Sequence, residues 1–194
     1  RERPVVTSAK GAYSEPVAEH ALALTLACLR QLPQKARAAL WQQERTGLSL
    51  FGNRVVIVGA GGVAQAIIDL LHPFRCDITV VRRNPNRAVD GVSRTIGPEA
   101  LQGYLETTDV LILAAAHTAG TEAMIGSDQL DALPAHAVLV NIARGALVDT
   151  DALVHALRHG QIAGAGLDVT DPEPLPDGHP LFELPQCLIT SHSA

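Results

Sequence analysis

The chain has 194 residues, enough for one large domain or for one and a half small ones. Its net charge of −5 gives no reason to expect nucleic acid or an anionic membrane as a partner. Hydrophobic residues make up 47% of the chain but aromatic residues only 3%, so its apolar content suits a parallel sheet covered by helices. Cys28, Cys76 and Cys187 are odd in number and have neither metal-ligand nor redox spacing, which predicts a reduced, cytoplasmic protein without a metal site.

The first 47 residues predict two helices. The pattern is helical from Glu15 to Leu32, with Pro33 after its end, and again near Gln34 to Arg45. Apolar residues cover most of the first helix, so we expect it to be buried between domains or subunits. Its most apolar run, Ala21 to Leu29, is too short to cross a bilayer.

From residue 48 onward, short apolar strands alternate with helical stretches. The expected strands are Val55–Val58, Ile78–Val81, Val110–Leu113, Val138–Asn141, Ala165–Val169 and Cys187–Thr190, with helices that include Gly62–Leu71 and Asp151–His159 between them. Such alternation predicts βαβ units with right-handed crossovers. The fold class is therefore α/β, a doubly wound parallel sheet of the Rossmann type over residues 48–194, with residues 1–47 as helices at its edge.

A glycine-rich turn directly follows the first strand and opens a helix. It reads Gly59-Ala-Gly61-Gly62-Val63-Ala64, a G-x-G-x-x-A pattern. The first glycine permits the tight turn, the second lets the backbone approach a pyrophosphate, and the small third residue lets helix and strand pack closely. The N–H groups of the helix end would then hold the phosphate. A plain glycine turn is the alternative, but the flanking strand and helix favour dinucleotide binding.

Two arginines follow the second strand, where proteins that prefer NAD place an acidic residue for the ribose hydroxyls. The chain has Arg82 and Arg83 at these positions. A guanidinium group matches a 2′-phosphate and also stacks on adenine. We therefore expect NAD(P) as cofactor, with NADP preferred over NAD; the alternative is a solvated arginine pair at a strand end.

Three further motifs each place a polar group just beyond an apolar strand. Arg144 ends Asn-Ile-Ala-Arg, Asp168 lies in Gly-Leu-Asp-Val, and His192 lies in Leu-Ile-Thr-Ser-His. Ligands of open α/β sheets bind at the carboxyl ends of the strands, so we expect these three side chains to face one crevice.

Taken together, these ordered motifs resemble the D-isomer-specific 2-hydroxyacid dehydrogenases, a family that includes phosphoglycerate, glyoxylate/hydroxypyruvate and D-lactate dehydrogenases. The resemblance runs from residue 11 to the end of the chain. It implies that Arg144 grips the substrate carboxylate and polarises the carbonyl, that His192 is the general acid/base, and that Glu173 is the carboxylate paired with it. It also implies that Asp168 holds the nicotinamide end. The remaining cofactor-binding candidates of the resemblance are Ala116, Thr121, Ile142 and Ala143.

The chemistry of 2-oxo acid reduction fits these three catalytic candidates. The proton donor should titrate near neutrality, as histidine does, and a neighbouring carboxylate stabilises its imidazolium form. The substrate carboxylate and the developing alkoxide favour a permanent, forked cation, which arginine supplies. Taken singly, Arg144 would be a turn residue, Glu173 a loop residue and His192 a solvated histidine; the joint placement at strand ends favours catalysis. The other histidines, His20 included, we expect to be surface or core residues.

The chain also departs from the family pattern. Gly62 stands where the family often has Arg or His, and Leu113-Ala-Ala-Ala116 replaces a frequent Leu-His-x-Pro. The largest difference is the absence of the family's second domain, which supplies much of the substrate pocket. Because the chain starts without Met and ends without a closing helix, we expect a fragment of a longer polypeptide.

The resemblance implies reversible reduction of a 2-oxo acid to a D-2-hydroxy acid, with glyoxylate or hydroxypyruvate as the first expectation, and a homodimer formed through this domain. The alternative is a dinucleotide-sensing binding module of the corepressor type, which retains the fold and the catalytic residues without significant turnover. A formate-type dehydrogenase is disfavoured, because that enzyme has Gln where Glu173 stands.

Overall fold

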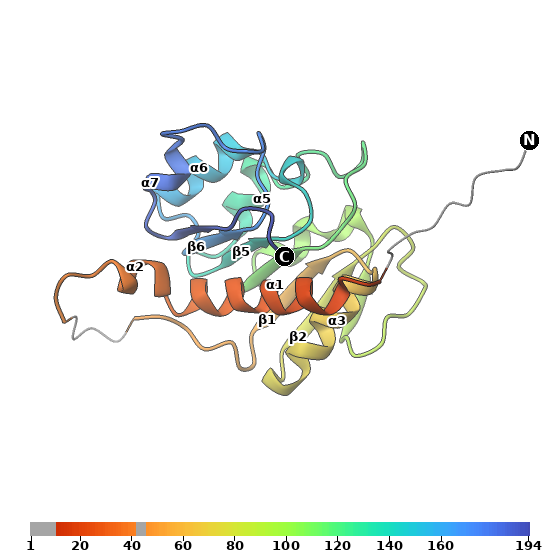
Figure 1. The fold of residues 1–194 in the computed structure, drawn as a ribbon. Coiled ribbons are helices and arrows are strands. Elements are labelled where there is room, and N and C mark those ends of the chain that lie inside the picture. Colours follow the sequence, from red (N-terminus) through yellow and green to blue (C-terminus); the bar gives the residue numbers. More distant parts are fainter. Residues whose placement is uncertain (1–10, 42–45) are drawn as a thin grey trace, which may run out of the picture.

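The structure, a computed structural model, describes residues 11–41 and 46–194. Within these ranges seven parallel strands form one sheet in the order β3-β2-β1-β4-β5-β6-β7 (Figure 1). The strands are β1 (Arg54–Val58), β2 (Asp77–Val81), β3 (Arg94–Ile96), β4 (Val110–Leu113), β5 (Val138–Asn141), β6 (Gly164–Leu167) and β7 (Cys187–Ile189). The strand order reverses between β1 and β4, which is where doubly wound sheets open a ligand crevice. The predicted Rossmann-type parallel sheet is confirmed.

Helices cover both faces of the sheet. They are α1 (Ser14–Leu29), α2 (Leu32–Ala36), α3 (Gly62–Leu71), α4 (Gln102–Leu105), α5 (Ser127–Ala132), α6 (Thr150–Arg158) and α7 (Pro180–Glu183). Side chains of a strand alternate between its two faces, so Val55 and Ile57 of β1 pack with α1 and α3, while Val56 and Val58 pack with the layer that holds α5 and α6. Because both faces are covered, the central strands are continuous apolar runs, as the sequence predicts. Figure 1 shows α1 crossing one face of the sheet.

No helix of the two described ranges is long and apolar enough to span a membrane.

The predicted elements differ from the structure mainly near the N-terminus. The first helix ends at Leu29 instead of Leu32, because Gln31 adopts a left-handed conformation with φ of 53° and interrupts it. The second helix, predicted from Gln34 to Arg45, covers only Leu32–Ala36, with its proline in the first turn; residues 42–45 lie outside the described ranges.

Two differences concern the strands. The three-residue edge strand β3 was not predicted from the sequence, and β6 ends at Leu167, two residues before the predicted end. The central strands β4 and β5, by contrast, have the predicted bounds.

A polar cluster ties three strands together at the amino-terminal edge of the sheet. The Asp109 carboxylate accepts hydrogen bonds from the backbone N of Arg54 at 2.7 Å and from its guanidinium nitrogens Nε and Nη2 at 3.2 and 3.1 Å. His136 Nε2 lies 2.8 Å from the same carboxylate. Burial raises the pKa of Asp109, but the hydrogen bonds from Arg54 and His136 outweigh it and leave that pKa below its ordinary value.

We expect Asp109→Asn to lower the free energy of unfolding by about 2 kcal/mol at pH 7, because the largely buried carboxylate loses its charge-assisted hydrogen bonds to Arg54. A depressed folded-state pKa stabilises the fold above the unfolded-state pKa, and this contribution is lost as the pH falls through the folded-state value. The difference from wild type should therefore shrink as the pH falls below the ordinary aspartate pKa. Urea unfolding at pH 7 and in acid measures it, with the exposed Asp90→Asn as control; a deficit that stays the same in acid would contradict this role.

Candidate active site

The glycine-rich turn joins β1 to the amino-terminal end of α3. Gly59 has a φ of 118°, and a Cβ placed on it would lie 2.5 Å from the backbone oxygen of Ala114, just after the neighbouring strand β4. This residue therefore permits the close strand-to-turn approach. Ala64, in the first turn of α3, is fully buried, as expected for the small residue of the pattern. These positions are structural, and they aim the helix end at the carboxyl edge of the sheet.

Gly61 is the N-cap of α3 and leaves the helix end open. Among the described residues no side chain caps the helix, and a Cβ placed on Gly61 would meet nothing within 4 Å. The N–H groups of the first turn, at Gly62 and Val63, thus have no side-chain acceptor at the cap. An uncapped ten-residue helix with free space before it fits a pyrophosphate. The residues present are therefore suited to a dinucleotide.

A hollow with a volume of about 380 Å³ lies beside this helix end. It is lined by Val63, Ala114, Ala115, Ala116, His117, Ile142, Ala143 and Arg144. Four of the predicted cofactor residues and the predicted catalytic arginine thus share one hollow. His117 was not predicted from the sequence as a site residue; its place four residues after the end of β4, in the loop at the carboxyl edge of the sheet, was the available signal. Thr121 supports this wall, since its hydroxyl donates to the backbone oxygen of Ala116 at 2.9 Å.

Arg82 and Arg83 follow the end of β2, beside the glycine turn. The last residues of β1 and β2 are register partners, so the two arginines continue from the strand next to the turn. Arg82 Nη1 donates to the backbone oxygen of Arg87 at 3.2 Å, and Arg83 is exposed. The second guanidinium of the predicted pair is thus free to meet a ligand at this edge.

The turn after β5 fixes the backbone of Arg144. The buried Asn141 accepts a hydrogen bond from the backbone N of Ala143 at 3.0 Å and donates one to the backbone oxygen of Arg144 at 2.9 Å. Arg144 Nη1 donates to the backbone oxygen of Ala143 at 2.6 Å. The first residue of the Asn-Ile-Ala-Arg motif therefore builds the turn that presents its arginine to the first hollow.

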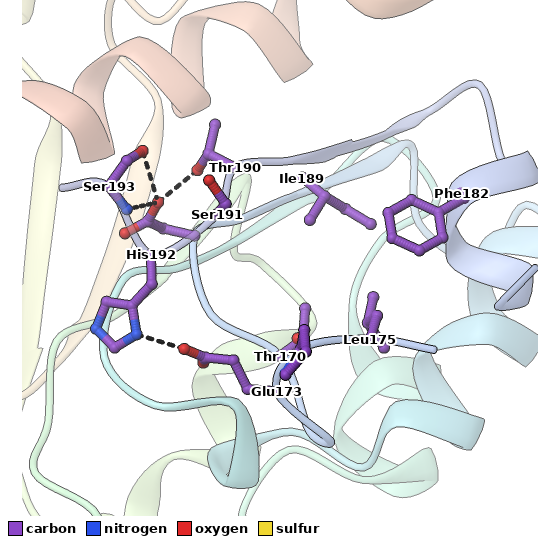
Figure 2. A pocket seen from close by; sticks show the side chains of 11 residues that line it. Thr170, Glu173, Leu175, Phe182, Ile189, Thr190, Ser191, His192 and Ser193 are labelled. Atoms are coloured by element: carbon purple, nitrogen blue, oxygen red, sulfur yellow. Dashed lines mark hydrogen bonds and ion pairs between the residues drawn. The ribbon is translucent and has the colours of Figure 1, made fainter. Parts of the chain in front are cut away.

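Glu173 and His192 form a hydrogen-bonded pair in a second hollow. His192 Nδ1 lies 2.6 Å from Glu173 Oε1, and the two side chains are 46% and 41% exposed (Figure 2). Because a carboxylate only accepts hydrogen bonds, Nδ1 carries the proton and Nε2 is left for a ligand. The hollow has a volume of about 580 Å³, and Leu175, Phe182 and Ile189 form an apolar wall beside the pair.

Asp168, directly after β6, is 2% exposed and supports the loop that carries His192. Its carboxylate accepts hydrogen bonds from Thr190 Oγ1 at 2.5 Å and from the backbone nitrogens of Ser193 and Ala194 at 3.0 and 3.1 Å. Burial raises the pKa of Asp168, but these donors and the nearby His20 together hold it below its ordinary value. An ionised Asp168 is therefore part of the folded loop.

The structure thus brings Glu173, Asp168 and His192 to one hollow and Arg144 to the other. The two hollows open at the carboxyl ends of neighbouring strands, since β5 pairs with β6 and β6 with β7. Thr190 and Ser193 were not predicted as supporting residues, because their role depends on contacts with Asp168 at another strand end and no local spacing reveals it. Asn141 was not predicted as a site residue either, although its contacts are local and it opens the Asn-Ile-Ala-Arg motif.

Comparisons with known proteins agree with this architecture. The chain is 38% identical over 192 residues to a Corynebacterium melassecola protein described only as uncharacterized, and 34% identical over 189 residues to human glyoxylate reductase/hydroxypyruvate reductase. These matches cover 96% and 92% of the chain but 63% and 57% of the relatives, so the chain spans about three fifths of their length.

A solved structure from Xanthobacter autotrophicus Py2 is also similar. It is a D-isomer specific 2-hydroxyacid dehydrogenase in complex with NADPH and MES, superposed with a TM-score of 0.87 at 33% identity over 100% of this chain and 80% of that one. The sequence profile of "D-isomer specific 2-hydroxyacid dehydrogenase, NAD binding domain" matches residues 22–194. The chain therefore belongs to the D-isomer specific 2-hydroxyacid dehydrogenase family and comprises its NAD-binding domain.

Proposed function

We propose that the protein is an NAD(P)-dependent oxidoreductase that reduces a 2-oxo acid reversibly to a D-2-hydroxy acid. The observation that carries this proposal is the 2.6 Å pair of His192 and Glu173, which lies at the same sheet edge as the open end of α3. Glyoxylate or hydroxypyruvate is the proposed substrate, because glyoxylate reductases are among the similar proteins.

The first hollow and the turn beside it would hold the dinucleotide. Gly61, Gly62 and Val63 would bind its pyrophosphate, and Arg82 and Arg83 its adenosine ribose. Ala116, Thr121, Ile142 and Ala143 would form the wall along it, with Asp168 towards the nicotinamide end. When bound, the reduced dinucleotide supplies the hydride.

The chain's own residues would bind the acid and move a proton. His192 donates the proton from Nε2 to the carbonyl oxygen of the substrate, while Glu173 holds Nδ1–H and stabilises the imidazolium form. Arg144 binds the substrate carboxylate and stabilises negative charge on the carbonyl oxygen. In the reverse direction, neutral His192 accepts the hydroxyl proton at the same nitrogen.

Turnover tests this proposal directly. The full-length protein is mixed with NADPH and with glyoxylate, hydroxypyruvate or phenylpyruvate, and oxidation is followed by the absorbance of NADPH. We expect oxidation with at least one of these acids. Tight nucleotide binding without oxidation by any of them would overturn the proposal in favour of a dinucleotide-sensing binding module.

We further propose that NADPH is preferred over NADH, since Arg82 and Arg83 replace the acidic ribose contact. Wild type should bind NADPH about tenfold or more tightly than NADH, and Arg82→Asp should remove or reverse this preference, because a charged hydrogen bond to the 2′-phosphate is lost. Quenching of protein or nucleotide fluorescence measures both affinities. Arg37→Asp, which makes the same charge change at the C-cap of α2 and away from the first hollow, is the control. Tighter binding of NADH by wild type would show this preference to be wrong.

We also propose that two copies pair through the N-terminal part of the domain. Leu32, Leu40 and Trp41 are 52%, 84% and 92% exposed beyond the end of α1, which leaves an apolar surface open to a second copy. Sedimentation should then show dimers at micromolar concentration. Monomers alone would contradict this assignment.

A further inference from the structure

One histidine outside the proposed catalytic set lies close to the loop that carries His192. His20 belongs to α1, which packs against β6 and β7, and its side chain is 24% exposed. His20 Nε2 lies 2.9 Å from Thr190 Oγ1 and 3.4 Å from Asp168 Oδ1. The sequence analysis leaves this histidine among the surface or core residues, and the structure places it within reach of the site.

The direction of the hydrogen bonds in this group follows from their partners. Thr190 Oγ1 has one proton, which it donates to the Asp168 carboxylate. Thr190 Oγ1 is therefore the acceptor toward His20, so Nε2 of His20 carries a proton. The result is a chain of two hydrogen bonds that runs from His20 on α1 through Thr190 to Asp168, and the three side chains are partly or fully buried.

Asp168 in turn holds the backbone conformation of His192. The backbone N of His192 donates to the backbone oxygen of Asp168 at 2.8 Å. The Asp168 carboxylate accepts hydrogen bonds from the next two backbone nitrogens, those of Ser193 and Ala194. His192 has a φ of 51°, in the left-handed region that non-glycine residues seldom adopt. Such a conformation persists only when its surroundings fix it, and Asp168 supplies these contacts.

We infer that His20 is a positioning residue for the proposed reaction: through Thr190 it fixes the Asp168 carboxylate, and through Asp168 it holds His192 in the conformation that meets Glu173. This inference rests on the proposed function for its catalytic consequence. Its structural part, that His20 orders the loop at residues 192–194, stands independently. Helix α1 thereby acts on the loop that carries His192 through its contact with Thr190.

The test compares three variants of the chain by NMR. His20→Phe fills the space without a donor, His20→Gln keeps a side-chain N–H that can reach Thr190, and His72→Phe makes the same exchange at an exposed histidine away from the site. We expect the amides of Ser193 and Ala194 to exchange about tenfold faster in His20→Phe, as for loss of one buried hydrogen bond. His20→Gln should restore most of this protection, and His72→Phe should not change it.

The same variants in the full-length protein show the catalytic consequence. His20→Phe should lower kcat about tenfold while the affinity for NADPH stays within about twofold of wild type. If His20→Phe does not fold, Thr190→Val removes the intermediate hydroxyl at nearly constant shape and should give the same two changes. Unchanged loop protection in a folded variant would overturn the inference. If the amides exchange faster in His20→Phe but the wild-type protein reduces no 2-oxo acid, the proposed function is wrong while the ordering of the loop by His20 stands.

Discussion

Replacing His192 with glutamine should lower kcat for reduction of the 2-oxo acid about 10³-fold, which is the range for loss of a positioned proton donor. Glutamine keeps a polar side chain of similar size but cannot transfer a proton near neutral pH. The affinity for NADPH should stay within about twofold, because the glycine turn and the first hollow are not altered. Steady-state kinetics in the full-length protein, together with nucleotide titration, measures the two effects separately.

Two further variants make this result specific. Glu173→Gln keeps an oxygen that accepts the 2.6 Å hydrogen bond from His192 but removes the charge, so its loss in kcat should be smaller, about tenfold to a hundredfold. His159→Gln, at the end of α6, makes the same exchange away from both hollows and should leave kcat unchanged. A His192→Gln protein that keeps kcat within tenfold of wild type would exclude His192 as the acid.

Adding one methyl group to the glycine turn should have very different effects on stability at Gly59 and at Gly61. Gly59→Ala should lower the free energy of unfolding by about 3 kcal/mol or more, because the new Cβ would lie 2.5 Å from a backbone oxygen and the φ of 118° disfavours any side chain. Gly61→Ala should change it by less than about 1 kcal/mol, because its Cβ meets open space. Urea unfolding of both variants measures the difference.

The same pair separates folding from nucleotide binding. Gly61→Ala places a methyl group where the pyrophosphate would approach the N-terminus of α3, so NADPH affinity should fall about tenfold or more in a protein of normal stability. Gly59→Ala that is as stable as wild type would contradict the close approach to Ala114. Gly61→Ala with unchanged NADPH affinity would show that the pyrophosphate does not lie over this turn.

The inner strands and the glycine turn could be predicted because their signals are local. The apolar runs of β4 and β5 coincide with the predicted strands, since both faces of these strands are covered; Asn141, at the end of β5, is the polar exception. The edge strand β3 has three residues and starts with an exposed arginine, so periodicity gives no signal for it. The left-handed Gln31 that separates α1 from α2 likewise has no sequence signature, because such conformations favour glycine or asparagine.

The reacting residues of the candidate site could be predicted from the sequence, but the residues that hold them in place could not. Arg144 and His192 each follow an apolar strand, and this spacing places them at one edge of a parallel sheet. The pairing of Glu173 with His192 came from the family resemblance, and the 2.6 Å contact agrees with it. The contact between His20 and Thr190 joins residues 170 positions apart, so it depends on how α1 packs on the sheet and not on any local pattern.

The position of a bound dinucleotide tests the central claim most directly. A crystal structure of the chain with NADPH should show the pyrophosphate against the backbone N–H groups of Gly62 and Val63, the 2′-phosphate beside Arg82, and the nicotinamide near the edge that carries Arg144 and His192. A dinucleotide bound away from the α3 terminus, or a nicotinamide ring on the opposite side of the sheet from His192, would contradict the account.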